Sequence, residues 1–285
     1  FVPGRRNSNI LPSQILERWA SYSNLKFAMT YQNRVVFFFD ILGFRDLVNR
    51  EFLKDNTKSE KIYEAFEFIN KFYEDEIPDE YNPTKQITFF SDSVLISFVP
   101  DDPDTIFSTI ATLQILLLNL ANRSIVMRGG ISVGQLFHDS KYIFGPAFIA
   151  AYDIESKIAK FPRIICDDSI VLLSQKGKAL HSARQDLEIF THIVRQDNDK
   201  YWHIDYIGNI ESLFDTGYEQ IDYLMKLHDF IVDNLKENTE PNVLEKYQWM
   251  KEKYNHTTID ILKNERLKDK DFDLYTYSKQ LKIIA

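Results

Sequence analysis

In the first part of the chain, short continuous apolar runs alternate with segments whose apolar residues recur at helical spacing. The residues from Val35 to Phe39 are continuously apolar, which is typical of a buried central strand. Further on, apolar side chains recur every three or four residues, and this spacing predicts an amphipathic helix that contains Ile62, Phe66, Ile69 and Phe72. The pattern therefore predicts a strand and, after a polar stretch, a helix.

Two more apolar segments of β-type composition lie close together. Gln86 to Phe90 and Val94 to Phe98 are separated only by Ser91, Asp92 and Ser93. Two short strands joined by so few polar residues predict a tight hairpin.

A second helix follows the hairpin. Helical spacing predicts a buried helix that contains Ile106, Ile110, Leu113, Leu117 and Leu120. The apolar stretch around it is interrupted by polar residues and is shorter than the roughly 20 apolar residues of a membrane span. We therefore expect a buried helix and no membrane insertion.

The segment from Ile125 to Phe137 predicts a long strand. Glycine is costly inside a strand, so three glycines in this segment indicate a bulge or the close approach of another backbone or a ligand. These glycines are Gly129, Gly130 and Gly134.

Tyr142 to Phe144 predicts a short strand, Gly145 to Lys160 a helix, and Arg163 to Cys166 another strand. Strands and helices in this order are typical of an α+β fold, with helices on one face of a mixed sheet.

The end of the chain predicts a hairpin of Leu187 to Val194 with Trp202 to Ile207, then amphipathic helices from Tyr218 onward, and a further helix is expected at Gln14 to Phe27. We expect three parts, which are an N-terminal helical segment at 1–33, a domain at 34–175, and a C-terminal hairpin and helical extension at 176–285 packed on that domain.

Composition narrows the functional classes. The chain has 285 residues, is 44% hydrophobic and has a formal charge of -8, and it contains no basic stripe that would favour nucleic acid. A single cysteine, Cys166, excludes an internal disulfide framework, and no signal peptide is recognisable, so we expect a cytoplasmic protein. Walker-type phosphate loops, nucleophile elbows and paired C-x-x-C motifs are absent from the sequence.

Two aspartates stand where predicted strands end. Asp40 closes the first apolar strand and is followed by a turn glycine, Gly43, and a helix start, and Asp92 lies at the tip of the hairpin. If the hairpin lies beside the first strand, the two carboxylates converge as a two-metal phosphoryl-transfer site requires. The alternative is that Asp40 caps the following helix and Asp92 serves the turn.

Four segments in this order resemble the successive motifs of class III adenylyl and guanylyl cyclases, and the resemblance covers residues 34 to 170. They are Phe39 to Phe44, Phe90 to Ser93, Met127 to Gly134 and Tyr142 to Ala147. The resemblance implies a mixed, mainly antiparallel sheet flanked by helices. It also implies a homodimer whose two active sites are shared between subunits.

The resemblance assigns roles to individual residues. It implies that Asp40 and Asp92 ligate two Mg²⁺ or Mn²⁺ ions, that the carbonyl of Ile41 completes one coordination shell, and that Arg128 binds phosphate. The alternative for Arg128 is an outward strand residue with a solvated head. The expected substrate-binding residues are Ile41, Gly43, Phe44, Arg45, Thr88 and Tyr142.

The sequence also departs from the cyclase pattern. Thr88 replaces the base-reading lysine, Tyr142 the base-reading aspartate, and Ile149 and Asp153 the transition-state asparagine and arginine. Either other cations stabilise the transition state or the domain has lost catalysis. The candidate cations are Arg45, Arg128, Lys141 and a residue of the hairpin from Arg195 to Lys200.

In these substitutions and in its helical C-terminal extension the chain also resembles the bacterial pyrimidine cyclases of the Pycsar antiphage systems. That likeness implies conversion of UTP or CTP to cyclic UMP or cyclic CMP, a messenger read by a downstream effector. Bulky side chains such as Tyr142 and Tyr152 would fill the space left by a smaller base, although both are equally compatible with core packing. The alternatives are a purine cyclase and a nucleotide-sensing domain without activity.

Overall fold

The computed structural model describes residues 30–54, 60–76, 84–100, 103–174 and 191–285. The chain divides into two compact units, Phe1–Tyr31 and Gln32–Ala285, and the fold described below is that of the second unit. The helix expected at Gln14 to Phe27 lies outside the described residues.

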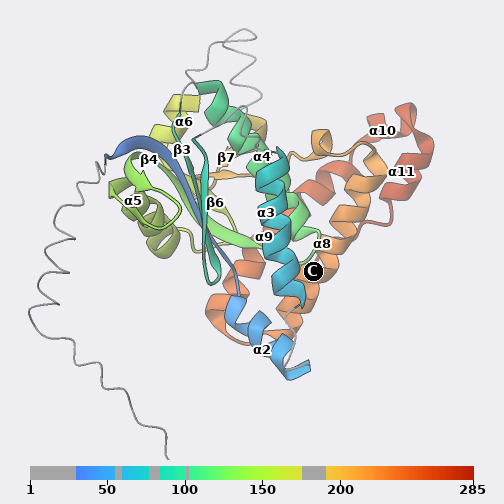
Figure 1. The fold of residues 1–285 in the computed structure, drawn as a ribbon. Coiled ribbons are helices and arrows are strands. Elements are labelled where there is room, and N and C mark those ends of the chain that lie inside the picture. Colours follow the sequence, from blue (N-terminus) through green and yellow to red (C-terminus); the bar gives the residue numbers. More distant parts are fainter. Residues whose placement is uncertain (1–29, 55–59, 77–83, 101–102, 175–190) are drawn as a thin grey trace, which may run out of the picture. The chain divides into compact units, whose positions relative to one another are not determined.

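The second unit is built on one mixed sheet in the order β2-β3-β1-β4-β6-β8-β7, with β5 paired to β4. Figure 1 shows this sheet together with the helices that pack on it. Only β4 and β6 run parallel, and the other neighbouring strands are antiparallel. The strands are β1 (Gln32–Ile41), β2 (Gln86–Phe90), β3 (Ser93–Phe98), β4 (Met127–His138), β5 (Ile143–Phe144), β6 (Ile164–Cys166), β7 (Val194–Gln196) and β8 (Trp202–Ile204).

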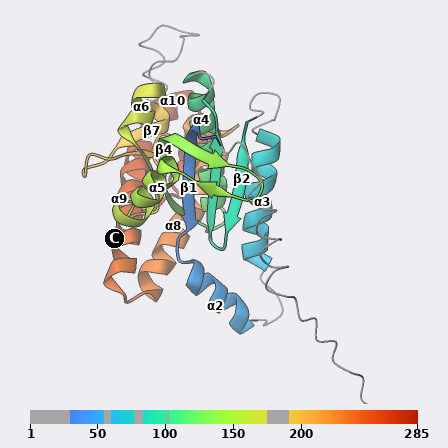
Figure 2. The same cartoon turned by 60° about the vertical axis from the view of Figure 1, so that its left-hand side comes forward.

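Helices surround this sheet, and Figure 2 shows it from a second direction. They are α2 (Phe44–Lys54), α3 (Glu60–Glu76), α4 (Pro103–Ala121), α5 (Pro146–Asp153), α6 (Asp168–Ser174), α8 (Gly217–Glu237), α9 (Pro241–Leu262), α10 (Glu265–Lys270) and α11 (Phe272–Ser278). A π-helical turn, η1 (Ile154–Ile158), continues α5, and a short 3-10 turn, η2 (Glu211–Leu213), precedes α8.

Strand β1 runs through the middle of the sheet and is buried on both faces, as its continuous apolar sequence predicts. Val35, Phe37 and Phe39 point into the main core, to which α3, α4, α6, α8 and α9 also contribute. The alternate residues Val36 and Phe38 pack on the opposite face with Ala147 and Ala151 of α5.

The close approach predicted at the β4 glycines occurs at Gly130. A Cβ atom built there would lie 2.6 Å from the Cβ of Ile154 and 2.7 Å from the carbonyl oxygen of Ala151. Because Gly130 carries no side chain, the end of α5 and the start of η1 lie directly against the sheet.

The C-terminal helices share the main core with the sheet. Tyr247, Trp249, Met250 and Tyr254 of α9 are buried, and they belong to the same cluster of apolar side chains as β1. A capping box at Thr216 and Glu219 fixes the start of α8. The division at residue 175 therefore stays a prediction, because the core continues across it.

The predicted α+β class is confirmed, with a mainly antiparallel sheet flanked by helices. Helices were expected on one face only, and this is wrong because α5 covers the opposite face. The late hairpin is present, but its first strand is β7 (Val194–Gln196), since residues 191–193 are helical, and residues 187–190 lie outside the described residues. None of the helices in the described parts of the chain is apolar and long enough to cross a bilayer.

Candidate active site

The C-terminal end of β1 and the tip of the β2–β3 hairpin lie side by side. In the β1–β3 pair Asp40 is opposite Ser93, and the backbone N–H of Ile41 donates to the carbonyl of Asp92 at 3.0 Å. Ser91, next to Asp92, has a left-handed φ of 56°, which is uncommon outside glycine. The pairing therefore brings Asp40 and Asp92 to the same end of the sheet.

A glycine turn joins β1 to α2. Gly43 has a φ of 75°, a conformation that side chains other than glycine rarely adopt, and α2 begins at the next residue. The first N–H groups of a helix have no partner within the helix, and they carry its positive dipole end. The backbone of Gly43, Phe44 and Arg45 is thus placed beside Asp40 in a form that suits phosphate oxygens.

Arg128 lies next to Asp40 on the adjacent strand. Asp40 and Arg128 are direct partners in the β1–β4 pair, and the guanidinium binds the carboxylate through Nε at 3.3 Å and Nη2 at 3.0 Å. The same Nη2 lies 2.5 Å from Oε1 of Glu155, which comes from η1. The Arg128 side chain thus lies between two carboxylates, which argues against the alternative of an outward residue with a solvated head, and phosphate binding by Arg128 stays a prediction.

The carboxylates of this cluster act on one another. Burial raises the pKa of Glu155 to about 7, and the charges of Asp40 and Asp92 add to that effect while Arg128 opposes it. Burial lowers the pKa of Arg128, but its hydrogen bond to Asp40 and the charges of Asp40, Glu155 and Asp92 outweigh burial and raise it. Two carboxylates therefore contact the guanidinium of Arg128, and the charge of a third, Asp92, also acts on it.

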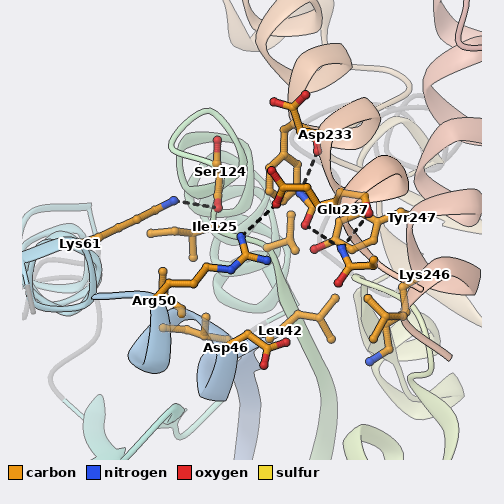
Figure 3. Close-up of a pocket in the computed structure, with 18 of the residues that line it drawn as sticks. Leu42, Asp46, Arg50, Lys61, Ser124, Ile125, Asp233, Glu237, Lys246 and Tyr247 are labelled. Carbon is orange, nitrogen blue, oxygen red and sulfur yellow. Dashed lines mark hydrogen bonds and ion pairs between the residues drawn. The ribbon is translucent and has the colours of Figure 1, made fainter. Parts of the chain in front are cut away.

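A lysine from the C-terminal extension comes close to the same cluster. Lys246 of α9 lines a pocket of about 520 Å³ that also includes Ile41, Leu42 and Gly43 of the β1–α2 turn. Burial lowers its pKa, the charge of Arg128 lowers it further, and the charge of Asp40 opposes both. In Figure 3 the ammonium group of Lys246 points away from the carboxylates of α8 that border the pocket.

The donor set at the end of β1 fits a hard divalent cation. Carboxylate and carbonyl oxygens are the ligands that Mg²⁺ prefers, and a Mg²⁺ ion held by one or two carboxylates completes its shell with water and substrate phosphates. Within the described residues no three His, Cys, Asp or Glu side chains form a ready metal cage. Asp40, Asp92 and the carbonyl of Ile41 supply oxygen donors of this kind at one end of the sheet.

The remaining candidate residues lie in different places. Thr88 stands on β2, on the same face of the sheet as Asp40. Tyr142 is 61% exposed beyond the end of β4, and its N–H donates to Asp139. Phe44 packs its ring against Phe66. Arg45 and Lys141 are exposed.

Arg195 is already engaged, because it forms an ion pair with Asp205 at 3.3 Å. Glu155 and Lys246 were missed by sequence reasoning. Neither residue has a sequence signal, because Glu155 lies in a mixed polar segment and Lys246 lies more than 200 residues from Asp40.

The fold and this cluster together define an α+β protein with a group of acidic side chains at the carboxyl end of its central strand. No protein-family model matches the chain, and no curated protein matches it.

Solved structures similar to the chain include the catalytic core of a rhodopsin-guanylyl cyclase with converted specificity in complex with ATPalphaS, at 18% identity over 50% of this chain and 80% of that chain, with a TM-score of 0.38. A bacterial light-regulated adenylyl cyclase matches at 16% identity over 51% and 81%, with a TM-score of 0.38. The adenylyl cyclase CyaB from P. aeruginosa matches at 17% identity over 50% and 80%, also with a TM-score of 0.38. These TM-scores are low, so the function is inferred from the residues of the site.

Proposed function

We propose that the protein is a nucleotidyl cyclase that converts a pyrimidine nucleoside triphosphate, UTP or CTP, to the 3′,5′-cyclic monophosphate and pyrophosphate. The observation that carries this proposal is the cluster at the end of β1, where Asp40 and Asp92 lie beside the glycine turn that opens α2 and Arg128 joins Asp40 to Glu155. An acidic centre beside a helix N-terminus suits two metal ions together with a triphosphate.

Asp40 and Asp92 would hold two Mg²⁺ or Mn²⁺ ions, which activate the ribose 3′-hydroxyl and neutralise charge on the phosphates when they are bound. The 3′-oxygen forms a bond to the α-phosphorus, its proton leaves to solvent, and the bond from that phosphorus to the bridging oxygen breaks to release pyrophosphate. The backbone at Gly43 and Phe44 donates to phosphate oxygens.

Two cations of this chain complete the proposed triphosphate site. Arg128 pairs with Asp40 and Glu155, and its long, always charged side chain would bind a phosphate of the triphosphate. Lys246 supplies a second cation from α9. We propose that these two residues compensate for Ile149 and Asp153, which stand where the cyclase resemblance places a transition-state asparagine and arginine.

The site would be shared by a homodimer. Several large apolar side chains on or near the α5 face of the sheet are exposed by more than a third, a composition that suits an interface. They are Phe90, Tyr142, Phe144, Ile149 and Tyr152. Sedimentation should then show a dimer, and specific activity should fall on dilution below its dissociation constant. A fully active monomer would contradict the shared site.

The pyrimidine preference and the place of the product in antiphage signalling rest on the resemblance to Pycsar cyclases. The Thr88 and Tyr142 replacements support it, because both standard purine contacts are missing. A downstream protein that senses the cyclic nucleotide is the expected partner.

One incubation tests the reaction. The purified full chain is mixed with each of the four ribonucleoside triphosphates and Mn²⁺ or Mg²⁺, and products are identified by mass spectrometry. We expect cyclic UMP or cyclic CMP from the protein and none from its Asp92→Asn variant. Comparable turnover of ATP or GTP would favour a purine cyclase, and metal-dependent binding without pyrophosphate release would favour a sensing domain.

A further inference from the structure

A continuous chain of hydrogen bonds crosses the sheet face that carries Asp40. Arg34 Nε donates to Ser97 Oγ at 3.0 Å, Ser97 Oγ lies 2.7 Å from Nδ1 of His138, and Nε2 of His138 lies 2.8 Å from Thr88 Oγ1. The four residues come from β1, β3, β4 and β2, respectively, and Thr88 is the last residue of this hydrogen-bond chain.

The distance from the proposed metal site to Thr88 matches the distance between the phosphates and the base of a nucleotide. Asp40 pairs with Ser93, while Phe38, two residues earlier on the same strand, pairs with Leu95, which pairs with Thr88. Thr88 is thus two strands sideways and two residues along from Asp40. With strands about 4.8 Å apart and about 3.4 Å per residue, the separation is about 12 Å.

The other end of this hydrogen-bond chain is the buried, positively charged guanidinium of Arg34. Arg34 is only 2% exposed, and its guanidinium also donates to the side chain of Gln32 and to the carbonyls of Thr84 and Ser97. These acceptors are all neutral, so the positive charge is not cancelled by them. The field of Arg34 therefore acts on every hydroxyl and ring nitrogen along the chain.

His138 is neutral in this setting. Burial and the charge of Arg34 together lower its pKa to about 4, against the opposing charge of Asp139. A neutral imidazole has one N–H, so the proton is on either Nδ1 or Nε2. With the proton on Nε2, Ser97 donates to Nδ1 and His138 donates to Thr88. With the proton on Nδ1, both of these bonds reverse.

The charge of Arg34 selects the first arrangement. Ser97 Oγ accepts from Arg34, and its own hydrogen is most stable when it points away from the guanidinium, toward His138. Each bond further along then points the same way. Thr88 Oγ1 accepts from His138, and its hydroxyl hydrogen is left to donate toward the open face of the sheet.

We propose that Thr88 reads the base of the nucleotide as a hydrogen-bond donor, with Ser97 and His138 as positioning residues that Arg34 polarises. A donor matches an oxo group such as O4 of uracil, whereas the amino group at the same position of cytosine is itself a donor and cannot accept the hydroxyl hydrogen of Thr88. The inference rests on the proposed function, since it places the nucleotide at Asp40, and it predicts UTP rather than CTP as the substrate.

The test compares Thr88→Val, which removes the hydroxyl at nearly constant volume, with Thr88→Ser, which keeps it. We expect the ratio of kcat/KM for UTP over CTP to fall roughly tenfold or more in Thr88→Val and to stay near its original value in Thr88→Ser. Thr276→Val, which changes an exposed threonine of α11, is the matched control. An unchanged ratio in Thr88→Val, or an equal loss in Thr88→Ser, would overturn the proposal.

Binding of 3′-deoxy-UTP and 3′-deoxy-CTP, measured by calorimetry with Mg²⁺, separates this inference from the proposed reaction. These analogues lack the attacking hydroxyl and cannot be cyclised. Tighter binding of the uridine analogue by the original protein but not by Thr88→Val supports base reading even if no triphosphate is turned over. Equal binding of both analogues, or binding of neither, overturns it.

The tautomer of His138 provides a direct readout of the positioning chain. Two-bond ¹⁵N–¹H correlation spectra of protein with ¹⁵N-labelled histidine should show the proton on Nε2. In Ser97→Ala the Nδ1 bond is lost, and we expect a mixture of tautomers together with a smaller UTP preference. A proton on Nδ1 in the original protein would refute the direction of the chain.

Discussion

Two clusters of charged side chains lie on adjacent parts of the sheet, and they differ in how their charges balance. The first surrounds Arg163, which is fully buried just before β6. Its guanidinium pairs with Asp197 at 3.0 Å and with Asp199, and Asp197 also binds Lys253 at 2.8 Å. Two cations meet two anions there, and Trp249 donates a further hydrogen bond to Asp197.

The second cluster surrounds Arg128. The next residue on β4, Gly129, donates its backbone N–H to the carbonyl of Arg163. Three carboxylates act on Arg128, and Lys246 is the second cation near them. Burial and this crowding raise the pKa of Glu155 to about 7. The first cluster is complete without a ligand, while the second has more acid than base. A buried balanced network is a structural unit, and a site with excess carboxylate favours added cations.

Removal of Arg163 should have the largest effect. Arg163→Met leaves two carboxylates without their buried partner, so we expect the free energy of unfolding in urea to fall by about 3 to 5 kcal/mol. Arg195→Met removes a half-exposed arginine with one ion pair and is the control, with an expected loss below about 1 kcal/mol. Similar losses of unfolding free energy in the two variants would show that the buried Arg163 network stabilises the fold no more than the half-exposed Arg195 pair.

Asp40→Asn should show the opposite pattern. The variant relieves the excess of carboxylates, so stability should be unchanged or higher, while product formation should fall by about a hundredfold or more because a metal ligand is lost. Activity and urea unfolding are measured on the same preparation, with Asp75→Asn on the exposed side of α3 as the control. An active Asp40→Asn with its metal requirement intact would place the metals elsewhere.

The first cluster should also set the pH dependence of stability. His203 packs against Trp249, and burial lowers its pKa to about 4, below the value of about 6.5 in an unfolded chain. The folded state therefore binds fewer protons, and its stability is full above pH 6.5 and declines as the pH falls toward 4. Between pH 7.5 and pH 5 this amounts to about 2 kcal/mol. In His203→Gln the loss of unfolding free energy between these two pH values, measured in urea, should be smaller by that amount. An unchanged pH dependence would show that folding does not lower the pKa of His203.

Lys246→Met should have the smallest effect of the four. It removes one cation from the proposed triphosphate site, so we expect KM for the triphosphate to rise roughly tenfold, with partial recovery in Lys246→Arg. Lys236→Met changes an exposed lysine of α8 and should leave KM unchanged. If the two lysine variants behave alike, the C-terminal extension contributes no charge to the site.

The part of the site that was predictable from sequence is the part built from neighbouring strands. An apolar strand that ends in Asp40 and a hairpin with Asp92 at its tip are local patterns, and antiparallel pairing then brings the two tips together. Glu155 reaches Arg128 from the π-helical turn of η1, and a regular α-helix was expected there. Lys246 reaches the site only through packing of α9, which depends on the whole core.

The polar chain was invisible for a related reason. Arg34 precedes an apolar run and His138 ends a strand, so each looks like an ordinary boundary residue. Their side chains come together only through the path of β4 across the sheet, and no local periodicity of the sequence encodes that path. Thr88 was singled out through the cyclase resemblance alone, and its bond to His138 came only from the structure.

The close contact between α5 and the sheet at Gly130 predicts a specific result in a mutational scan. A methyl group at this position would collide with Ile154 and with the backbone of Ala151, one turn before Glu155. It would displace the segment that carries Glu155 while the main core on the other face of the sheet keeps its packing. A library screened for both abundance and activity should therefore tolerate alanine at position 130 in the first measurement and reject it in the second.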